Sequence, residues 1–192
     1  MRAGAGGRPR RTMATKTART GRTGNTEKGG MKRTRVGASD KSRAVLRYSV
    51  NIGASEQQVW NALTDWEHQD DWMLGTRVRG TTNGGQGVGG GVEAWTGLGP
   101  LGFLDTMVIT AWEPPNRCEV DHVGKLIRGA GAFYVGATKD GGSVLTWVED
   151  VIVPGGALGM LGWRVIRPAV RYGVRRSLMR LSASLSKAAA TK

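Results

Sequence analysis

The sequence contains little cysteine and little histidine. Cys118 is the only cysteine among 192 residues, and His68 and His122 are the only histidines. One thiol cannot form an intramolecular disulfide, and these three residues are too few for a thiol-rich or zinc site built from the chain itself. We therefore expect no metal and no cofactor, and a reducing, cytoplasmic compartment.

Long apolar runs are also lacking. The segment VIVPGGALGMLGW (151–163) is too short and too rich in glycine to span a bilayer. Arg10 and Arg11 are not followed by an apolar run of signal-peptide length. The sequence thus predicts neither export nor a membrane-spanning segment.

Acidic residues are scarce at both ends of the chain. Residues 1–43 contain 13 Lys and Arg against two acidic residues, and residues 163–192 contain eight basic and no acidic residue. Residues 44–162 carry seven basic and 13 acidic residues, a net charge of −6. The net charge of +13 therefore comes from the two termini, with a basic C-terminal element on an acidic body.

The N-terminal segment has almost no apolar side chains. Its Gly, Thr, Arg and Lys cannot bury enough surface to offset the entropy of ordering, so we predict a disordered basic tail over 1–43 and a folded domain over 44–192. One interpretation of the tail is an arm that contacts nucleic acid or an anionic membrane, although it has no aromatic ring on which bases could stack. The other is a solvated extension, with Met13 or Met31 as the true start.

The folded part begins with strand-like patterns. Apolar and β-branched residues alternate in short runs, bounded by turns rich in Gly, Pro and Asn. Such short connections favour antiparallel neighbours. The predicted strands are 44–52, 76–81, 88–96, 103–112, 117–123, 128–137 and 143–153.

Two short helices are predicted after the first strand. Ser55 followed by Gln58 is a capping-box pattern, and residues 65–71 predict a second short helix or turn. Six residues advance an α-helix by about 600°, so three tryptophans at this interval cannot share one helical face. These tryptophans are Trp60, Trp66 and Trp72.

A long helix is predicted from Trp163 to about Ser186. Its sheet-facing apolar arc consists of Trp163, Ile166, Val170, Val174, Leu181 and Leu185. Three arginines on an adjoining arc should face solvent: Arg164, Arg171 and Arg175. Four glycines predict a pliable link before this helix: Gly155, Gly156, Gly159 and Gly162.

The predicted fold class is α+β: a seven-stranded, curved antiparallel sheet wrapped around the long C-terminal helix. One helix seldom covers so large a sheet completely, so we expect a cavity between them.

The segment ASEQQVWNALTDWEHQDDWM (54–73) resembles the first strand-to-helix region of the START-like superfamily, also called SRPBCC, the polyketide cyclase/dehydrase and lipid-transport group. Gly-Pro-Leu-Gly (99–102), Trp-Glu-Pro-Pro (112–115) and Trp-Val-Glu-Asp (147–150) are also similar to its bacterial members. The resemblance covers about 44–186. It implies a helix-grip fold with an internal apolar cavity for lipids, sterols, quinones or polyketides, and some members catalyse cyclisation.

Titratable side chains are predicted on the inward face of the sheet. The turn before Arg117 places Met107 opposite His122, and the resulting alternation carries Asp105 and Glu149 inward. Each of these three could act in acid/base chemistry, with His122 as a base or hydrogen-bond donor. Alternatively, His122 is satisfied in the core, and the carboxylates are paired or solvated at the end of the sheet.

Aromatic and methionine side chains are predicted to converge around the cavity. The candidate ligand-binding residues are Trp72, Trp95, Met107, Phe133, Trp147, Met160 and Trp163. Core filling is the alternative role for such rings. The leading hypothesis is a protein that binds a small hydrophobic ligand, and the sequence does not distinguish an enzyme from a carrier. The alternative is an interaction module that binds nucleic acid or an anionic membrane through its basic tail and Arg-rich helix.

Overall fold

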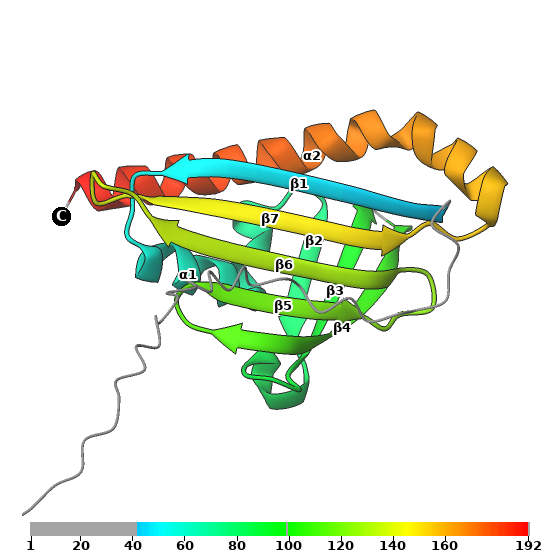
Figure 1. Cartoon of the computed structure of the whole chain (residues 1–192), viewed down its shortest axis with the longest axis horizontal. Coiled ribbons are helices and arrows are strands. Elements are labelled where there is room, and N and C mark those ends of the chain that lie inside the picture. Colours follow the sequence, from blue (N-terminus) through cyan, green and yellow to red (C-terminus); the bar gives the residue numbers. More distant parts are fainter. Residues whose placement is uncertain (1–41, 99, 192) are drawn as a thin grey trace, which may run out of the picture. The chain divides into compact units, whose positions relative to one another are not determined.

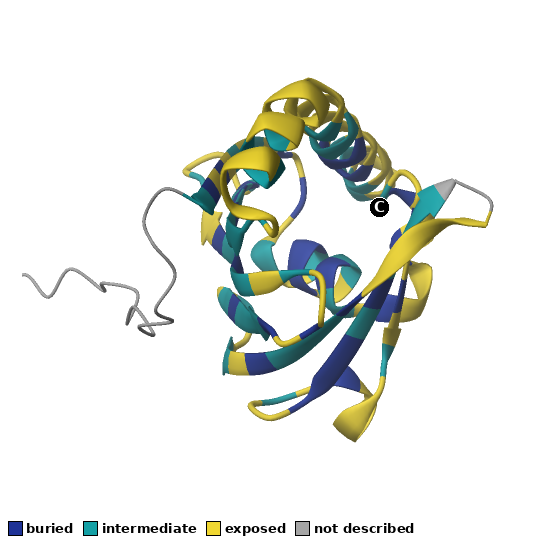
Figure 2. Cartoon of the chain, turned by 90° about the vertical axis from the view of Figure 1, so that its right-hand side faces the viewer, coloured by how far each residue is buried: buried dark blue, intermediate teal, exposed yellow. Residues whose placement is uncertain are grey.

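A computed structural model describes residues 42–98 and 100–191 (Figure 1). In chain order its elements are β1 (Arg43–Ile52), α1 (Glu56–Thr64), η2 (Trp66–Asp71), β2 (Thr76–Gly80), η3 (Thr82–Gly85), β3 (Gly91–Leu98), β4 (Leu101–Glu113), β5 (Arg117–His122), β6 (Arg128–Ala137), β7 (Ser143–Ile152) and α2 (Gly156–Ala190). The seven strands form one antiparallel sheet in the order β1-β7-β6-β5-β4-β3-β2. Figure 2 shows α1 and α2 on the concave side of the curved sheet. The predicted α+β helix-grip fold is confirmed.

The edge strand β1 begins slightly earlier than predicted. Arg43 is already paired in the sheet opposite Ile152, and its Nε donates to Asp150 Oδ1 at 2.9 Å. The folded domain therefore includes at least residues 42 and 43, which we had assigned to the tail. The rest of the predicted tail, 1–41, lies outside the described residues.

The three regularly spaced tryptophans enter two different parts of the core. The capping box is confirmed: the Ser55 hydroxyl accepts from the Gln58 backbone, and the Gln58 side chain accepts from the Ser55 N–H at 3.0 Å. α1 then ends and the 3-10 helix η2 redirects the chain. Trp60 and Trp66 consequently pack in one cluster, whereas Trp72 packs in the other.

The core consists of two clusters that share one aromatic ring. The first contains Ile52, Ala54, Val59, Leu63, Trp72, Val135, Leu145, Leu178 and Leu181. The second contains Trp60, Trp66, Val78, Val92, Ala94, Ile109 and Cys118. Phe133 packs against both clusters, so the centre of β6 joins the two halves of the interior.

The glycine-rich link before the last helix is helical, contrary to the prediction. Gly155 caps the helix in the left-handed region, with φ 83°, and α2 already begins at Gly156. A Cβ atom on Gly159 would overlap the Pro154 carbonyl oxygen, which lies in the preceding turn. This glycine therefore serves close backbone packing, and α2 is continuous across Pro168 up to Ala190. Within the described part of the chain, no helix is long and apolar enough to cross a membrane.

Only the second half of α2 is firmly attached to the rest of the domain. Leu181 is buried, and hydroxyl groups along this half bond backbone groups of the body: Ser177 accepts from the Leu74 N–H, and Ser186 accepts from the Gly53 N–H, both at 2.9 Å. In the first half, Ile166 from the predicted sheet-facing arc remains 54% exposed. The concave face is thus incompletely covered there.

Packing at Leu145 should dominate the stability of the first cluster. The side chain is 0% exposed, so Leu145→Ala should lower the free energy of unfolding by roughly 2–5 kcal/mol through lost transfer energy and a cavity. Urea denaturation followed by circular dichroism measures this loss. The same change at Leu101, which is 80% exposed, should alter stability by less than about 0.5 kcal/mol; equal losses at both positions would contradict the described core.

Candidate functional site

The strands β4, β5 and β7 each contribute one of the predicted titratable residues, and β6 lies between β5 and β7. The observed register of β4 and β5 pairs Met107 with His122, as predicted. Asp105 lies two residues before Met107 on β4 and therefore on the same face of the sheet. Glu149 reaches this face from β7, on the far side of β6. Asp105, His122 and Glu149 therefore form one polar cluster on the concave face of the sheet.

A glycine on β6 makes this meeting possible. Gly131 pairs with Val120 on one side and with Glu149 on the other. A Cβ atom at this position would lie 3.1 Å from both His122 Nε2 and Glu149 Oε2, tighter than ordinary van der Waals contact. The alternation of glycine in RGAGAFYVGA was visible in the sequence, yet its role in clearing space for the cluster was missed.

His122 bridges the two carboxyl groups. Its Nδ1 lies 2.7 Å from Asp105 Oδ2, and its Nε2 lies 3.0 Å from Glu149 Oε2. Trp147 Nε1 donates to the second Glu149 oxygen at 2.6 Å. The His122 side chain is only 5% exposed, so these bonds form largely out of water.

The two carboxyl groups decide the charge of the imidazole. Burial by itself would lower the pKa of His122, but the hydrogen bonds and negative charges of Asp105 and Glu149 outweigh burial and raise that pKa to about 10. With both ring nitrogens facing acceptors, His122 is an imidazolium at neutral pH and donates both N–H groups. This state suits an electrostatic anchor and a proton donor better than the general base that we considered from the sequence.

One oxygen of the cluster has no hydrogen-bond partner. Asp105 Oδ1 is buried and unpaired among the described residues. A Cβ on Gly124 would lie 3.6 Å from it, so the turn after β5 approaches this atom without bonding it. Because buried acceptors are normally satisfied, this unpaired oxygen sets Asp105 apart from the other members of the cluster.

Three of the seven predicted ligand-binding side chains lie beside this cluster. Met107, Phe133 and Trp147 lie half-buried on the concave face, and the Phe133 and Trp147 ring centroids are 5.2 Å apart. Tyr48, which sequence reasoning missed, pairs with Trp147 and has a buried hydroxyl with no partner in the described residues. Its place in the alternation of β1 was the available signal.

The α2 candidates belong to the incompletely covered half of the helix. Met160 and Trp163 are half-buried there, and neither is a member of the two core clusters. The helical position of Trp163 was predicted, whereas Met160 was assigned to the link before the helix and lies within α2. The structure does not assign either residue a hydrogen bond among the described residues.

Trp95 lies on the other face of the sheet. It pairs with Leu104 and Arg77, whereas its neighbour Ala94 pairs with Asp105 on the concave face. Its ring lies across Gly97 and Gly102, where a Cβ would come within 3 Å of ring atoms. The structure therefore does not bring Trp95 together with the polar cluster.

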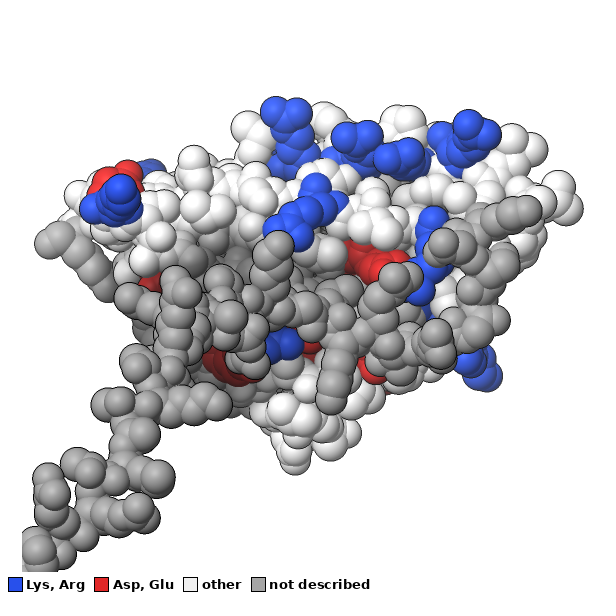
Figure 3. Space-filling model, in the orientation of Figure 1, with Lys and Arg blue, Asp and Glu red and all other residues white. Residues whose placement is uncertain are grey.

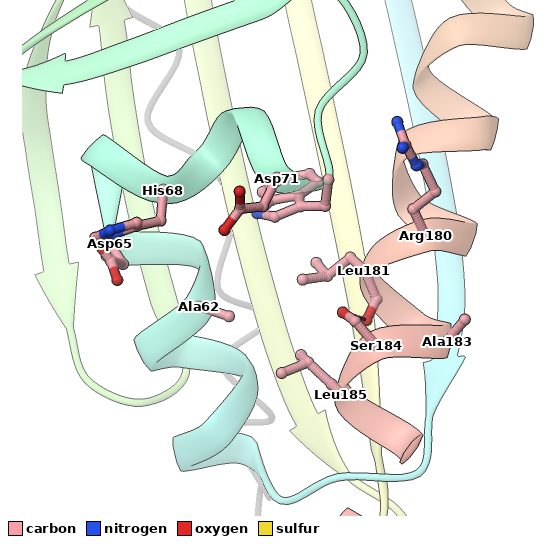
Figure 4. A pocket seen from close by; sticks show the side chains of 10 residues that line it. Ala62, Asp65, His68, Asp71, Arg180, Leu181, Ala183, Ser184 and Leu185 are labelled. Atoms are coloured by element: carbon pink, nitrogen blue, oxygen red, sulfur yellow. Dashed lines mark hydrogen bonds and ion pairs between the residues drawn. The ribbon is translucent and has the colours of Figure 1, made fainter. Parts of the chain in front are cut away.

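Trp72 lines a separate pocket of about 500 Å³ (Figure 4). The pocket lies between the α1–η2 region and the second half of α2, with Leu181 and Leu185 directed across it. His68 Nδ1 lies 2.8 Å from Asp65 Oδ1 at its rim, and both side chains are exposed. Trp72 is buried in the first core cluster, so its position on a pocket wall and its role in the core coexist.

Metal binding gains no support from the geometry. Across residues 42–98 and 100–191, no group of three or more His, Cys, Asp or Glu side chains is arranged to hold an ion. The lone thiol of Cys118 is buried, and burial raises its pKa to about 12, so it stays protonated and unreactive at neutral pH.

Comparison with protein families identifies the family of this chain. Residues 43–186 match the family described as polyketide cyclase / dehydrase and lipid transport, and the chain belongs to this family. The START-like, SRPBCC-type resemblance of the sequence is thereby confirmed. Comparison with curated proteins found no significant match.

Solved structures share the fold at low sequence identity. The ZhuI aromatase/cyclase from Streptomyces sp. R1128 has a TM-score of 0.63 and 12% identity, over 76% of this chain and 94% of that one. The di-domain aromatase/cyclase StfQ of steffimycin biosynthesis has a TM-score of 0.61 and 12% identity over 78% of this chain, which spans about half (53%) of StfQ. Norcoclaurine synthase from Thalictrum flavum has a TM-score of 0.55 and 12% identity, over 76% and 95%.

We expect His122 to carry a proton on both ring nitrogens between about pH 6 and pH 9, because its pKa is raised to about 10. Nitrogen-15 NMR of the imidazole rings distinguishes this cation from a neutral tautomer. His68, which is exposed and bonded to Asp65, provides a second imidazole signal for comparison. A His122→Gln variant assigns the signals, and a neutral His122 ring at pH 7.5 would contradict the bridging arrangement.

The raised pKa of His122 also predicts how stability depends on pH. The protonated imidazole binds its partners only in the folded state, so its contribution is complete below the unfolded pKa of about 6.5 and is lost as pH rises through about 10. The difference in unfolding free energy between the wild type and His122→Gln should therefore shrink steadily from pH 6.5 to pH 10. Denaturation at several pH values measures it, and a difference that grows with pH would be the wrong sign.

Proposed function

We propose that the chain binds a small, largely apolar ligand with a hydroxyl or enol group against the concave face of the sheet. The observation that carries this proposal is Asp105 Oδ1, a buried acceptor without a partner among the described residues. Leaving such a group unsatisfied costs about 1–3 kcal/mol. A ligand O–H that donates to Asp105 removes this cost and fixes the orientation of the ligand.

The side chains around the acceptor favour a flat ligand. Trp147 and Phe133 pack on each other at a tilt of 56° and lie on the same face of the sheet as Met107. Rigid rings bind planar apolar groups with little loss of side-chain entropy. Polyketide, quinone and isoprenoid compounds fit this description, and the family match together with the fold of the aromatase/cyclases supports the polyketide type first.

Acid/base chemistry is the finer part of the proposal. In an aldol-type cyclisation, a base removes a proton beside a carbonyl, the enolate forms a C–C bond to a second carbonyl carbon, and an acid protonates the resulting alkoxide. Asp105 suits the base and His122 the acid. Their hydrogen bond of 2.7 Å lets the proton gained by Asp105 return to His122, so the cluster ends as it began.

The charge state of the cluster nevertheless favours ligand binding over catalysis. With a pKa of about 10, only on the order of one His122 in a thousand is neutral at pH 7. Proton transfer is most efficient when the pKa lies near the working pH. The resting cluster is therefore better built to hold a ligand than to turn it over.

The nucleic-acid interpretation has less support. It depended on the basic tail, which lies almost wholly outside the described residues, and on the Arg-rich helix α2, whereas the family match favours small-molecule binding. The polar cluster on the concave face offers carboxyl groups, which repel phosphate.

A pair of probes tests the role of Asp105. We expect 2-hydroxyanthraquinone to bind more tightly than anthraquinone, because its hydroxyl cannot bond a ring carbonyl internally and is free to donate to Asp105 Oδ1. Asp105→Asn should weaken binding of the hydroxylated probe about tenfold or more, as a hydrogen bond to a charged group is lost, and should leave anthraquinone within about twofold. Isothermal titration calorimetry measures both affinities.

Glu93→Gln is the matched control for this experiment. Glu93 lies on β3, where it pairs with Arg79, and its alternation places it on the face opposite Ala94 and Asp105. Its removal should not change either affinity. Equal binding of both probes by the wild type and Asp105→Asn would refute the proposed donor site. Solvent extraction of the purified chain followed by mass spectrometry would identify a natural ligand directly.

A further inference from the structure

The outer face of α2 carries an exposed apolar stripe. Its side chains recur every three, four or seven residues and fall within an arc of about 60° on a helical wheel. They are Leu158 (81% exposed), Leu161 (61%), Val165 (75%), Tyr172 (70%) and Met179 (51%). The buried Leu181 lies on the opposite side of the helix, so the stripe faces away from the sheet. It extends over about 32 Å of helix.

Arginines flank this stripe on both sides. By the same wheel Arg164, Arg171 and Arg175 lie on one side and Arg180 lies on the other. Arg176 lies at the edge of the stripe itself, at the angle of Leu158. Figure 3 shows basic side chains spaced along the edge of the molecule formed by α2. From Gly156 to Ala190 the helix contains six arginines, Lys187 and no acidic residue.

These arginines are free to meet an external anion. Within the described residues, none of the six arginines of α2 makes an ion pair or hydrogen bond through its side chain. Arg164, Arg167 and Arg171, together with Pro168, line one hollow of about 440 Å³ beside the stripe. Guanidinium groups bind phosphate with paired N–H donors, and three of them around one hollow suit a phosphorylated head group.

We infer that the outer face of α2 docks on an anionic lipid surface. An apolar stripe bordered by arginine is the pattern of a helix that lies in the plane of a membrane interface, with the stripe among the acyl chains and the cations among the head groups. This surface goes beyond the proposed ligand site and does not depend on it.

Other occupants fit the surface less well. A second copy of α2 would bring arginines against arginines with no acidic residue to pair them, which opposes association. Nucleic acid would satisfy the arginines, but its phosphates would have to lie against leucine, valine and methionine. Only a partner that is both apolar and anionic along the whole stripe satisfies both features.

Vesicle flotation with the full chain tests the inference. The wild type should bind vesicles of phosphatidylcholine with 30% phosphatidylglycerol and bind pure phosphatidylcholine far more weakly. Leu158→Gln with Val165→Gln should lower the partition coefficient about tenfold or more, because two apolar side chains no longer enter the bilayer. The matched control is Leu101→Gln with Val88→Gln, two side chains that are 80% and 68% exposed outside α2, which should change binding less than twofold.

A charge-matched set separates α2 from the basic tail, which is present in every variant. Arg164→Gln, Arg167→Gln and Arg171→Gln together should lower binding to the anionic vesicles by about a hundredfold, at roughly fivefold per arginine. Arg47→Gln, Arg77→Gln and Arg128→Gln together remove the same charge from exposed positions of the sheet and should have a much smaller effect. Circular dichroism confirms that each variant is folded.

Three results would overturn the inference. The first is α2 variants that bind anionic vesicles as well as their matched controls, which would assign binding to the tail. The second is a dimer in sedimentation analysis that is lost in the Leu158/Val165 variant, which would place a second copy on the stripe. The third is duplex DNA binding that depends on the α2 arginines while vesicle binding does not, which would assign the surface to nucleic acid.

Discussion

The long helix α2 has to cover the part of the concave face that α1 leaves open, and it is attached to the body along only half its length. Ser177 and Ser186 bond the second half to the body, and Leu181 is buried beneath it. The first half keeps Ile166 exposed and Trp163 half-buried. On the concave face Met107, Phe133 and Trp147 are likewise only half-buried, and the polar cluster lies beside them.

The polar cluster itself is governed by a shortage of donors. Its two carboxyl groups present four oxygens, whereas His122 and Trp147 together supply three N–H groups. One carboxyl oxygen of the cluster therefore has no donor within it, and in the structure this oxygen is Asp105 Oδ1. A Cβ atom at Gly131 would lie 3.1 Å from both His122 Nε2 and Glu149 Oε2, so these two atoms would have to shift to accommodate it. The absence of a side chain at position 131 therefore supports the close approach of His122 and Glu149.

Much of this arrangement could be predicted from the sequence, because strands alternate and short turns fix the register. The turn before Arg117 was enough to place Met107 opposite His122 and to direct Asp105 inward. Trp95 could not be placed in this way, since β3 has no regular alternation of apolar residues and its face is decided by pairing with β2 and β4. The start of α2 was mispredicted because a glycine that permits a close backbone approach, Gly159, looks the same in a sequence as one that adds flexibility.

The two faces of α2 are subject to different constraints. A helical wheel used only to find the sheet-facing residues overlooks the apolar residues on the outer face. The arc centred on Leu181 has to match the sheet, so its apolar residues are explained by the fold. The opposite arc through Leu158 and Tyr172 is largely exposed in the described domain, so the fold gives no reason for its apolar residues. The same helix separates these arcs by only about 10–12 Å. A ligand on the concave face and a lipid surface on the outer face would thus be within one helix diameter of each other, at the half of α2 that is least firmly attached.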